Sequence, residues 1–346
     1  MAERTGTEVL ARDRRNGRDE GIHHGVAVVV DGQGAIVSSI GDPSYPAYTR
    51  STIKIVQAIP LFETGAVEKF DLTESELALC CASHTGADYH VKGVQSILQK
   101  IGMPESGLGC GGHLPEDRTM RERLIRAEGT PTAIYNNCSG KHAGMLACCI
   151  AAGWPTDSYL ELDHPLQQRI LALVAEFSDV SSEEIHTAVD GCSLPTYYLS
   201  MQALATMGAR VIERGRGAGN GSGGEDPADI TPERRLLAAI NAHPEMVESE
   251  EGFDTALIRA IDDICYVKRG AMGTMLVAME SASRGPIAIA VKIADGSSRP
   301  MPPIVIGLLM QQELLTPDER ERLEPWRREV LKNRVGTVTG EIVFAG

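Results

Sequence analysis

The stretch Arg50-Ser51-Thr52-Ile53-Lys54 follows a turn-rich segment at 41–46 and opens an apolar run from Ile55 to Phe62. This pattern predicts a helix that begins near Ser51. Residues three positions apart share a helix face, so the amine of Lys54 would reach the hydroxyl of Ser51. A serine becomes a nucleophile only when a base takes its proton, and a lysine serves as that base only in its neutral form. The stretch therefore predicts a nucleophilic serine beside a buried lysine, with backbone N–H groups near the serine to hold an oxyanion. The alternative is an ordinary capped helix whose lysine reaches solvent.

Composition limits the classes of protein that this chain can represent. Of its 346 residues, 42% are hydrophobic, which is enough for one large domain or two smaller ones. The formal charge of −14 leaves no basic stripe for phosphates and argues against nucleic acid or an anionic membrane as a partner. No apolar stretch has the length of a membrane span, and the first thirty residues lack the pattern of a secretion signal. We therefore expect a cytoplasmic protein whose 8 cysteines are core thiols, metal ligands or reactive groups.

The order of the expected elements favours an α+β chain. A hairpin is predicted at 24–40, and two adjacent late strands are predicted at 273–279 and 286–293. Predicted helices lie at 72–79, 91–101, 141–152, 164–177, 194–207, 303–315 and 317–331. Thr73 and Glu76 have the spacing of a capping box at the start of the first of these helices. Early and late strands around a helical block predict one mixed sheet flanked by helices, with a separate helical cluster.

This order also predicts the domain organisation. Residues 1–22 are charged and are expected to form a flexible tail, and 23–346 are expected to form a single domain. Its helical part would span about 51–270, and its sheet would come from 24–40 and 271–294. The glycine-rich segment 214–229 is expected to be a surface loop or hinge.

A second cluster of reactive residues lies at 136–142, where Cys138 and Lys141 repeat the three-residue spacing with a thiol in place of the hydroxyl. Cys192 lies in another Gly/Pro turn, in Asp190-Gly191-Cys192-Ser193-Leu194-Pro195. Two thiolates on separate turns can share a zinc ion, with Lys141, His142 or water completing a tetrahedron. Burial of both cysteines as small core residues is the alternative.

Two further segments offer polar groups in glycine-bounded surroundings. Lys268 precedes Gly270 and Gly273 at the start of a predicted strand, where a glycine-rich edge lets a ligand approach the backbone closely. A solvated turn is the alternative there. Ser83-His84 lies in a loop after a predicted helix, and a histidine in such a loop is more often structural than catalytic. Asp190 could receive a substrate ammonium group or cap its own loop.

Together these segments resemble the Rhizobium etli-type, or class 3, L-asparaginases. The motifs are Arg50-Ser51-x-x-Lys54, Ala82-Ser83-His84, Asn137-Cys138-Ser139-Gly140-Lys141-His142-Ala143-Gly144, Asp190-Gly191-Cys192 and Lys268-x-Gly270-Ala271-x-Gly273. The resemblance spans roughly residues 24–314. It implies a fold similar to that of serine β-lactamases, penicillin-binding proteins and serine glutaminases.

The resemblance also implies the residues of the site. It implies two Ser–Lys pairs, Ser51 with Lys54 and Ser83 with Lys268. It implies a zinc ion held by Cys138, Lys141 and Cys192 with water. Four residues would either contact the substrate or support the groups that do, and Gly273 would be a further substrate contact; the four are Arg50, His84, His142 and Asp190. The family has a cysteine near the site where this chain has Asp254, so no role is assigned to Asp254.

The function that follows is hydrolysis of L-asparagine to aspartate and ammonia through an acyl-enzyme, with Ser51 as the first choice of nucleophile. A homodimer is implied by the resemblance. The alternatives are a serine glutaminase, a β-lactamase-like hydrolase, and a non-enzymatic regulator that binds zinc or an amino acid. One methylene separates asparagine from glutamine, and such a difference is worth only about 1–3 kcal/mol.

Overall fold

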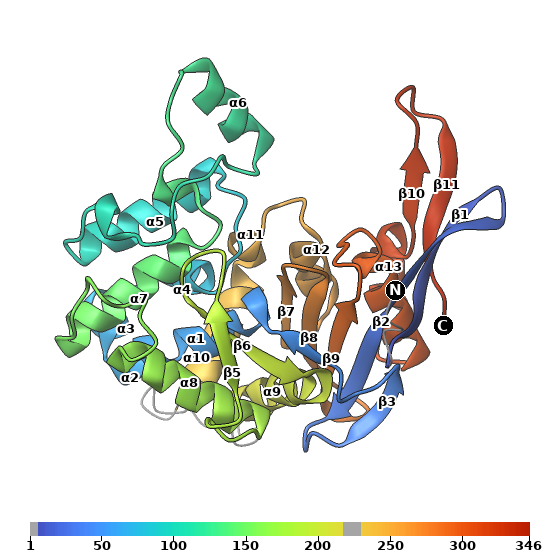
Figure 1. The fold of residues 1–346 in the computed structure, drawn as a ribbon, viewed down its shortest axis with the longest axis horizontal. Coiled ribbons are helices and arrows are strands. Elements are labelled where there is room, and N and C mark those ends of the chain that lie inside the picture. The colour runs from blue at the N-terminus through green and yellow to red at the C-terminus, as the bar shows by residue number, and fades with distance from the viewer. Residues whose placement is uncertain (1–5, 217–229) are drawn as a thin grey trace. The chain divides into compact units, whose positions relative to one another are not determined.

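The computed structural model describes residues 6–216 and 230–346 (Figure 1). The described chain forms two compact units. The sheet unit consists of the described part of Met1–Thr52 together with Leu199–Glu213 and Ala256–Gly346, and the helical unit consists of Ile53–Tyr198 and the described part of Arg214–Thr255. The predicted α+β class is confirmed. The single domain expected at 23–346 stays a prediction, and the expected glycine-rich loop falls mostly on 217–229, outside the described residues.

The sheet unit is built on an antiparallel sheet with the strand order β10-β11-β1-β2-β9-β8-β7, and β3 pairs with β2 off this path. The strands are β1 (Glu8–Arg15), β2 (Arg18–Asp31), β3 (Ile36–Ile40), β7 (Cys265–Gly270), β8 (Thr274–Ser281), β9 (Gly285–Ile293), β10 (Glu329–Lys332) and β11 (Val338–Phe344). Residues 25–30 of β2 are all buried, as expected for a strand in the middle of a sheet. The pairing of Val28 with Ala290 joins the early and late strands in one sheet, which confirms that expectation.

Helices pack on this sheet, and the sheet unit also contains several short elements. The remaining elements are β4 (Pro46–Tyr48), η1 (Arg50–Ile53), most of α9 (Met201–Gly215), α13 (Met301–Gln311), α14 (Pro317–Leu323) and η5 (Glu324–Trp326). The α9 helix packs closely on β8 and β9, because Gly208 faces Leu276 and Ala288. The α13 helix packs against β1 and β11.

Three expectations from the sequence are wrong. The flexible tail at 1–22 is replaced from Glu8 onward by β1 and the start of β2, whose charges pair across the hairpin, as Arg12 does with Asp19 at 2.6 Å. The helix expected at 194–207 begins at Met201, because 195–200 form β6 (Pro195–Ser200) and pair with β5 (His186–Val189). The helix expected at 317–331 ends at Leu323, and β10 follows it.

The helical unit surrounds one buried helix, α7 (Ser139–Ala152). Its other helices are α1 (Lys54–Ala58), α2 (Pro60–Glu63), α3 (Ala66–Lys69), α4 (Glu74–Cys80), α5 (Asp88–Lys100), η2 (Glu105–Gly107), α6 (Arg118–Arg126), η3 (Ala133–Tyr135), α8 (Pro165–Ser178), α10 (Pro232–Ala242), α11 (Pro244–Val247) and the start of α12 (Phe253–Ala260). Residues 139–149 of α7 are all buried, as expected for a helix that is small and apolar on every side. It packs against α1, α2, α3, α4, α5 and α8.

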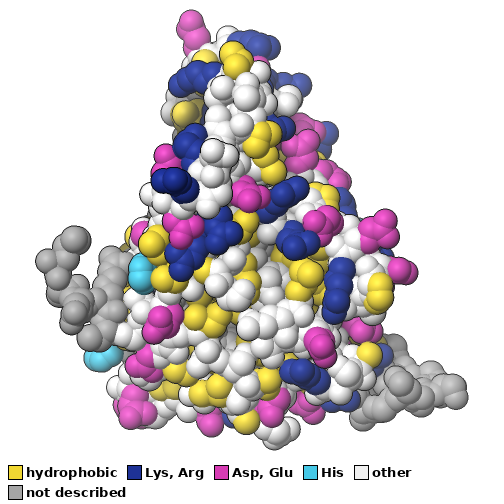
Figure 2. Space-filling model, turned by 90° about the vertical axis from the view of Figure 1, so that its right-hand side faces the viewer, with side chains coloured by type: hydrophobic (Ala, Val, Ile, Leu, Met, Phe, Trp, Pro, Cys, Tyr) yellow, Lys and Arg dark blue, Asp and Glu magenta, His cyan; other side chains and the backbone are white. Residues whose placement is uncertain are grey.

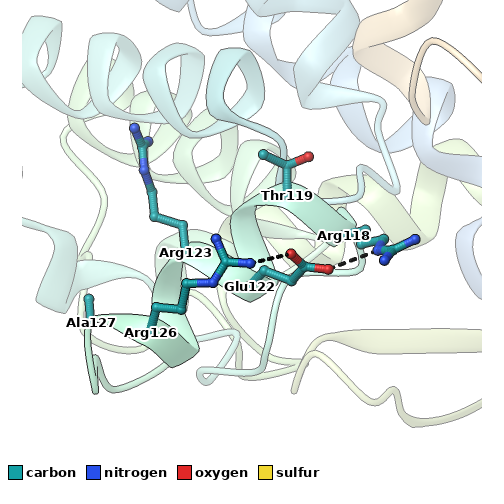
Figure 3. Close-up of a pocket in the computed structure, with 6 residues that line it drawn as sticks. All are labelled: Arg118, Thr119, Glu122, Arg123, Arg126 and Ala127. Carbon is teal, nitrogen blue, oxygen red and sulfur yellow. Dashed lines mark hydrogen bonds and ion pairs between the residues drawn. The ribbon is translucent and has the colours of Figure 1, made fainter.

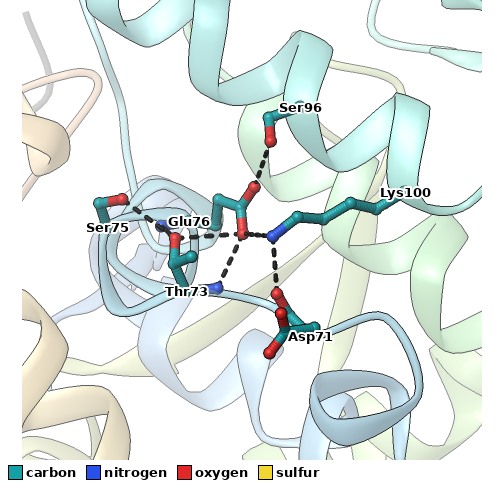
Figure 4. A network of polar contacts seen from close by, with 6 residues as sticks. All are labelled: Asp71, Thr73, Ser75, Glu76, Ser96 and Lys100. Carbon is teal, nitrogen blue, oxygen red and sulfur yellow. Dashed lines mark hydrogen bonds and ion pairs between the residues drawn. The ribbon is translucent and has the colours of Figure 1, made fainter.

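The start of α4 is fixed by the predicted capping box. Thr73 accepts a hydrogen bond from the backbone of Glu76, and the Glu76 carboxylate accepts one from the backbone of Thr73 at 2.8 Å. The same carboxylate accepts hydrogen bonds from Ser96 and Lys100, each at 2.7 Å (Figure 4). Burial raises the pKa of Glu76, but these donors outweigh burial and leave the pKa lowered. The network ties the start of α4 to α5.

Two glycines on one face of α7 let the end of α4 approach it closely. A Cβ atom at Gly140 would lie 2.5 Å from the carbonyl oxygen of Leu79, and one at Gly144 would lie 2.7 Å from the sulfur of Cys80. Both distances are shorter than any ordinary carbon contact, so only glycine fits there. The close approach brings the loop that follows α4 beside the first turn of α7.

The surface carries both signs of charge. On the face shown in Figure 2, Lys and Arg side chains are interspersed with Asp and Glu, and no continuous basic stripe is visible. Within 6–216 and 230–346, no helix combines the length and the apolar character that crossing a membrane requires.

Candidate active site

The amine of Lys54 is the centre of a buried polar cluster in the helical unit. Lys54 is the first residue of α1 and is fully buried, which confirms the predicted burial of this lysine. Its Nζ donates hydrogen bonds to Ser83 Oγ at 2.9 Å and to Cys138 Sγ at 3.3 Å, and a further one to the carbonyl oxygen of Ala82. Lys54 therefore contacts a serine hydroxyl, as a general base must.

The loop that carries Ser83 is held by its backbone on both sides. The N–H of Ser83 donates to the carbonyl of Val247 at 2.9 Å, and that of His84 donates to the carbonyl of Asn137 at 3.1 Å. The N–H of Thr85 donates to the carbonyl of Glu248 at 3.2 Å. These N–H groups already have acceptors, so they cannot form the oxyanion hole that was expected from backbone groups beside the nucleophilic serine.

His84 uses both of its ring nitrogens within the protein. Its Nδ1 accepts a hydrogen bond from the N–H of Gly86 at 3.1 Å, and its Nε2 lies 2.9 Å from Ser139 Oγ. The ring stacks on that of His90, with 4.9 Å between the centroids. Burial, followed by the neighbouring charges of His90 and Lys54, lowers the pKa of His84 well below its ordinary value, so the ring is neutral near pH 7.

The helical unit also brings together the three residues of the expected Cys–Lys–Cys cluster. Lys141 Nζ donates a hydrogen bond to Cys192 Sγ at 3.2 Å, and the thiols of Cys138 and Cys192 are close enough to shift each other's pKa. The neighbouring thiol of Cys192 and the charges of Lys54 and Lys141 lower the pKa of Cys138 despite its burial, whereas the pKa of Cys192 is raised. Burial lowers the pKa of Lys141, but the two sulfur atoms outweigh it and leave that pKa raised. The cluster thus holds thiolate character beside the ammonium group of Lys141.

These donor atoms fit a zinc ion. Ligand atoms around a tetrahedral zinc lie about 3.5 Å apart, given Zn–S near 2.3 Å and Zn–N near 2.0 Å. The 3.2 Å between Lys141 Nζ and Cys192 Sγ is close to that spacing. Within the described ranges, no group of three or more His, Cys, Asp and Glu side chains is placed to hold a metal, so a zinc site here depends on the amine of Lys141.

His142 and Asp190 lie next to this cluster in the chain. The Nδ1 of His142 lies 2.7 Å from the hydroxyl of Tyr159, which also accepts a hydrogen bond from Gly109 at 2.8 Å. The Nε2 of His142 is buried and has no hydrogen-bond partner among the described residues. Asp190 closes its own turn, because its carbonyl accepts from Ser193 at 2.9 Å, and its carboxylate lies 3.9 Å from Cys192 Sγ.

The other expected site residues belong to the sheet unit. Ser51 lies in η1, which is a 3₁₀ turn where an α-helix was expected, and Arg50 before it has a left-handed φ of 50°. Such a backbone is strained for a residue other than glycine and is found most often at functional sites. Lys268 is buried on β7 and its Nζ donates to the carbonyl of Arg269 at 3.0 Å. Gly273 has a left-handed φ of 68° in the turn before β8.

The sequence motifs missed two residues that shape the cluster. Asn136 donates from its side chain to the carbonyls of Cys110 and Gly111, and its side-chain oxygen accepts from the N–H of Cys138 at 2.9 Å. Tyr159 holds His142, as described above. Asn136 lies in the stretch 136–142 that the sequence singles out, although no role was expected for it, and no local signal marks Tyr159.

A surface hollow beside α6 contains none of the expected site residues. It is lined by Arg118, Thr119, Glu122, Arg123, Arg126 and Ala127 (Figure 3). Glu122 pairs with Arg118 at 2.9 Å and with Arg126 at 3.0 Å, each four residues away. Such exposed pairs are typical of a solvated helix and contribute little to stability. The hollow offers no group suited to hydrolysis.

The fold and the polar cluster together define an α+β protein with a candidate hydrolytic site. The family model for L-asparaginase II matches residues 11–344, so the chain belongs to this family and is an amidohydrolase. The family expected from the motifs is thereby confirmed. No curated protein sequence matches the chain significantly.

Two solved glutaminase structures are similar to this chain. One is the Bacillus subtilis glutaminase YbgJ in covalent complex with 5-oxo-L-norleucine, at 12% identity and a TM-score of 0.37 over 84% of this chain and 88% of that one. The other is a Bacillus glutaminase in 4.3 M NaCl, at 11% identity and a TM-score of 0.36 over 84% and 91% of the two chains.

Proposed function

We propose that this amidohydrolase cleaves the side-chain amide of L-asparagine by Ser–Lys chemistry beside a zinc site. The observation that carries the proposal is the contact between the buried Lys54 Nζ and Ser83 Oγ at 2.9 Å. The family supplies the class of substrate, a small-molecule amide. The contact favours Ser83 as the nucleophile over Ser51, the first choice from the sequence. Ser51 and Lys268 stay sequence-based predictions.

In the first half of the reaction, neutral Lys54 takes the proton of Ser83 as Oγ attacks the carboxamide carbon. The C–N bond then breaks, Lys54 returns the proton to the leaving nitrogen, and ammonia departs. In the second half, Lys54 takes a proton from water as its oxygen attacks the acyl ester. The ester C–O bond breaks, the proton returns to Ser83 Oγ, and aspartate is released.

In both halves of the reaction, cationic side chains stabilise the negative charge on the oxygen of the substrate. The backbone N–H groups of the Ser83 loop cannot do so, because they are already paired. Lys54 becomes an ammonium group next to the reacting oxygen. Lys141 lies within electrostatic range of the same Cys138 sulfur that Lys54 contacts. When bound, a zinc ion held by Cys138, Lys141 and Cys192 would supply Lewis-acid polarisation of an oxygen.

We assign binding of the substrate asparagine to residues for which the resemblance implies a role at the site. His142 is the best supported of these, because its buried Nε2 has no protein partner among the described residues and can accept or donate one hydrogen bond. Asp190 is a further candidate for the substrate ammonium group, and Arg50 and Gly273 stay sequence-based predictions. The proposal also includes a cytoplasmic homodimer, and light scattering would establish the oligomeric state.

The test is ammonia release from L-asparagine and from L-glutamine by the purified full-length chain. We expect asparagine to be the better substrate, and Ser83→Ala and Lys54→Met each to lower kcat by at least about 10³-fold. Ser181→Ala, which changes an exposed serine, is the control and should leave the rate unchanged. Full activity in Ser83→Ala with loss of activity in Ser51→Ala would show that Ser51 is the nucleophile. Full activity in both variants would show that neither serine is the nucleophile.

A further inference from the structure

The two stacked histidines beside Ser83 have the same pattern of hydrogen bonds. In each ring, Nδ1 faces a backbone N–H, from Gly86 for His84 and from Ala87 for His90. An N–H can only donate, so Nδ1 must be the acceptor and the hydrogen of each neutral ring must lie on Nε2. The Nε2 of His90 lies 3.0 Å from the carbonyl of Glu245, and that of His84 lies 2.9 Å from Ser139 Oγ.

The direction of the hydrogen bond between His84 and Ser139 is fixed by the other bond that Ser139 makes. Ser139 Oγ donates its hydrogen to the carbonyl of Ile134 at 2.9 Å, so its lone pair receives the Nε2–H of His84. His84 is 1% exposed and Ser139 is fully buried. With a donor on one side and an acceptor on the other, the His84 ring has no nitrogen left for a substrate.

The hydrogen bond between His84 and Ser139 joins two segments that carry residues of the candidate site. His84 follows Ser83 directly, and Ser139 follows Cys138, whose sulfur and the Ser83 hydroxyl both contact Lys54. The ring therefore bridges the loop that carries the serine and the first residue of α7. The bond to Ser139 is the side-chain link that holds Ser83 at the Lys54 amine.

We propose that His84 is a positioning residue that holds Ser83 against Lys54 through its hydrogen bond to Ser139, and that it does not contact the substrate. The inference rests on the nucleophilic role proposed for Ser83. The resemblance left two roles open for His84, contact with the substrate and support of a group that contacts it, and the inference chooses the second. Misplacing a reacting group by about 1 Å can lower a rate by about 10²-fold, which sets the scale of the expected effect.

Two substitutions of His84 separate the bridge from the local turn. An asparagine amide can still accept from Gly86 two residues on but is too short to reach Ser139. A glutamine places an N–H donor near the position of Nε2 and keeps the bridge while losing the bond to Gly86. We expect His84→Asn and Ser139→Ala to lower kcat for asparagine by about 10–100-fold with KM unchanged, and His84→Gln to stay within a few-fold of wild type. The double variant His84→Asn/Ser139→Ala should lose no more than either single one.

His90→Gln is the matched control, because His90 has the same hydrogen-bond pattern but ties the first turn of α5 to α11. It should lower the melting temperature while kcat stays within a few-fold of wild type. A second readout does not depend on asparagine. It is the rate at which a small sulfonyl fluoride modifies Ser83, with the modified residue located by peptide mass spectrometry. Rates are compared only among variants that circular dichroism shows to be folded.

The outcomes separate the inference from the proposed function. Suppose that wild type does not hydrolyse asparagine, but that labelling of Ser83 is slower in Ser139→Ala and His84→Asn and not in His84→Gln. This result would support the bridge and show that asparagine is not the substrate. A raised KM with unchanged kcat in His84→Asn would make His84 a substrate contact and overturn the inference. Equal labelling and equal kcat in all folded variants would overturn it as well.

Discussion

At the scale of single residues, the helical unit contains two buried tyrosines with opposite hydrogen-bond status. The hydroxyl of Tyr159 interacts with Gly109 and His142, whereas the hydroxyl of Tyr197 has no partner among the described residues although the side chain is fully buried. A buried hydroxyl stabilises a protein only when its hydrogen bonds are made. The same substitution should therefore have different effects at the two positions.

We predict that Tyr159→Phe lowers the free energy of unfolding by about 1–3 kcal/mol, because it leaves Gly109 N–H and His142 Nδ1 without partners. Tyr197→Phe should leave that free energy unchanged or raise it slightly. Urea unfolding followed by circular dichroism measures both. Equal destabilisation by the two substitutions would mean that the Tyr197 hydroxyl has a partner, such as a bound water, and would contradict the prediction.

The stacked histidines predict how stability depends on pH. Burial lowers the pKa of His90 from 6.5 to about 4, against the opposing effects of its bond to Glu245 and the charge of Asp117. Between these two values the unfolded chain binds a proton that the folded chain does not, so stability is complete above pH 6.5 and falls as the pH drops toward 4. His90 alone should account for a loss of about 3 kcal/mol across this range.

Unfolding free energies of wild type and His90→Gln, measured at several pH values between 4 and 7, test this account. The variant should be less stable at pH 7 and should lose stability less steeply as the pH falls. The remaining slope is expected from His84, whose pKa is lowered in the same direction. Identical slopes for the two proteins would show that His90 does not titrate as described.

At the scale of elements, the position of Ser83 depends on how closely α4 approaches α7. The sequence motifs identify Ser83, Lys54 and Cys138 separately, but only the packing of Gly140 and Gly144 against α4 brings them within hydrogen-bond distance. The pairing of Lys54 with Ser83 was not predicted, because the two are separated in sequence and spacing along one helix reports only local neighbours.

Gly140→Ala and Gly144→Ala should differ in severity. The new methyl group at 140 would meet the backbone oxygen of Leu79, which cannot move without displacing α4, whereas the one at 144 would meet the sulfur of the Cys80 side chain. Overpacking of this kind lowers stability by about 1–3 kcal/mol, and we expect Gly140→Ala to reach the upper end. It should also slow the modification of Ser83 by a sulfonyl fluoride. Thermal unfolding and labelling rates measure both, and a larger effect from Gly144→Ala would contradict the packing argument.

At the scale of the whole molecule, the sequence predicts the apolar strands of the sheet better than the polar ones. The central strands β2, β8 and β9 are apolar runs bounded by turns, and all were expected. The strands β1 and β10 are polar and depend on their pairing partners. The strand β1 pairs with β2 and with the distant β11, and β10 pairs with β11, where Arg328 next to β10 forms an ion pair with Glu341. Charge patterns of this type are equally typical of a solvated tail, so sequence periodicity cannot distinguish the two.

The same limit applies to the site. Cys138, Lys141 and Cys192 were expected to share a site, and the helical unit brings them together. Whether the thiol pair holds a metal depends on the free energy of binding as well as on geometry. A metal that binds only the folded chain stabilises it, by about 2.7 kcal/mol at a hundredfold excess over Kd. Zinc would link α7 to the turn that precedes β6, so the helical unit should be the part that responds.

We therefore predict about one zinc ion per chain in protein purified without chelator, and a lower melting temperature after chelation. Cys138→Ser and Cys192→Ser should contain almost no zinc and should no longer respond to chelator. Cys149→Ser, which changes another buried cysteine on α7, should keep its metal even if it unfolds at a lower temperature. Metal analysis by mass spectrometry and differential scanning calorimetry provide the two readouts. Because both are independent of catalysis, a wild-type chain that contains no zinc and does not respond to added zinc would reject the metal site while leaving the Ser83–Lys54 proposal to its own test.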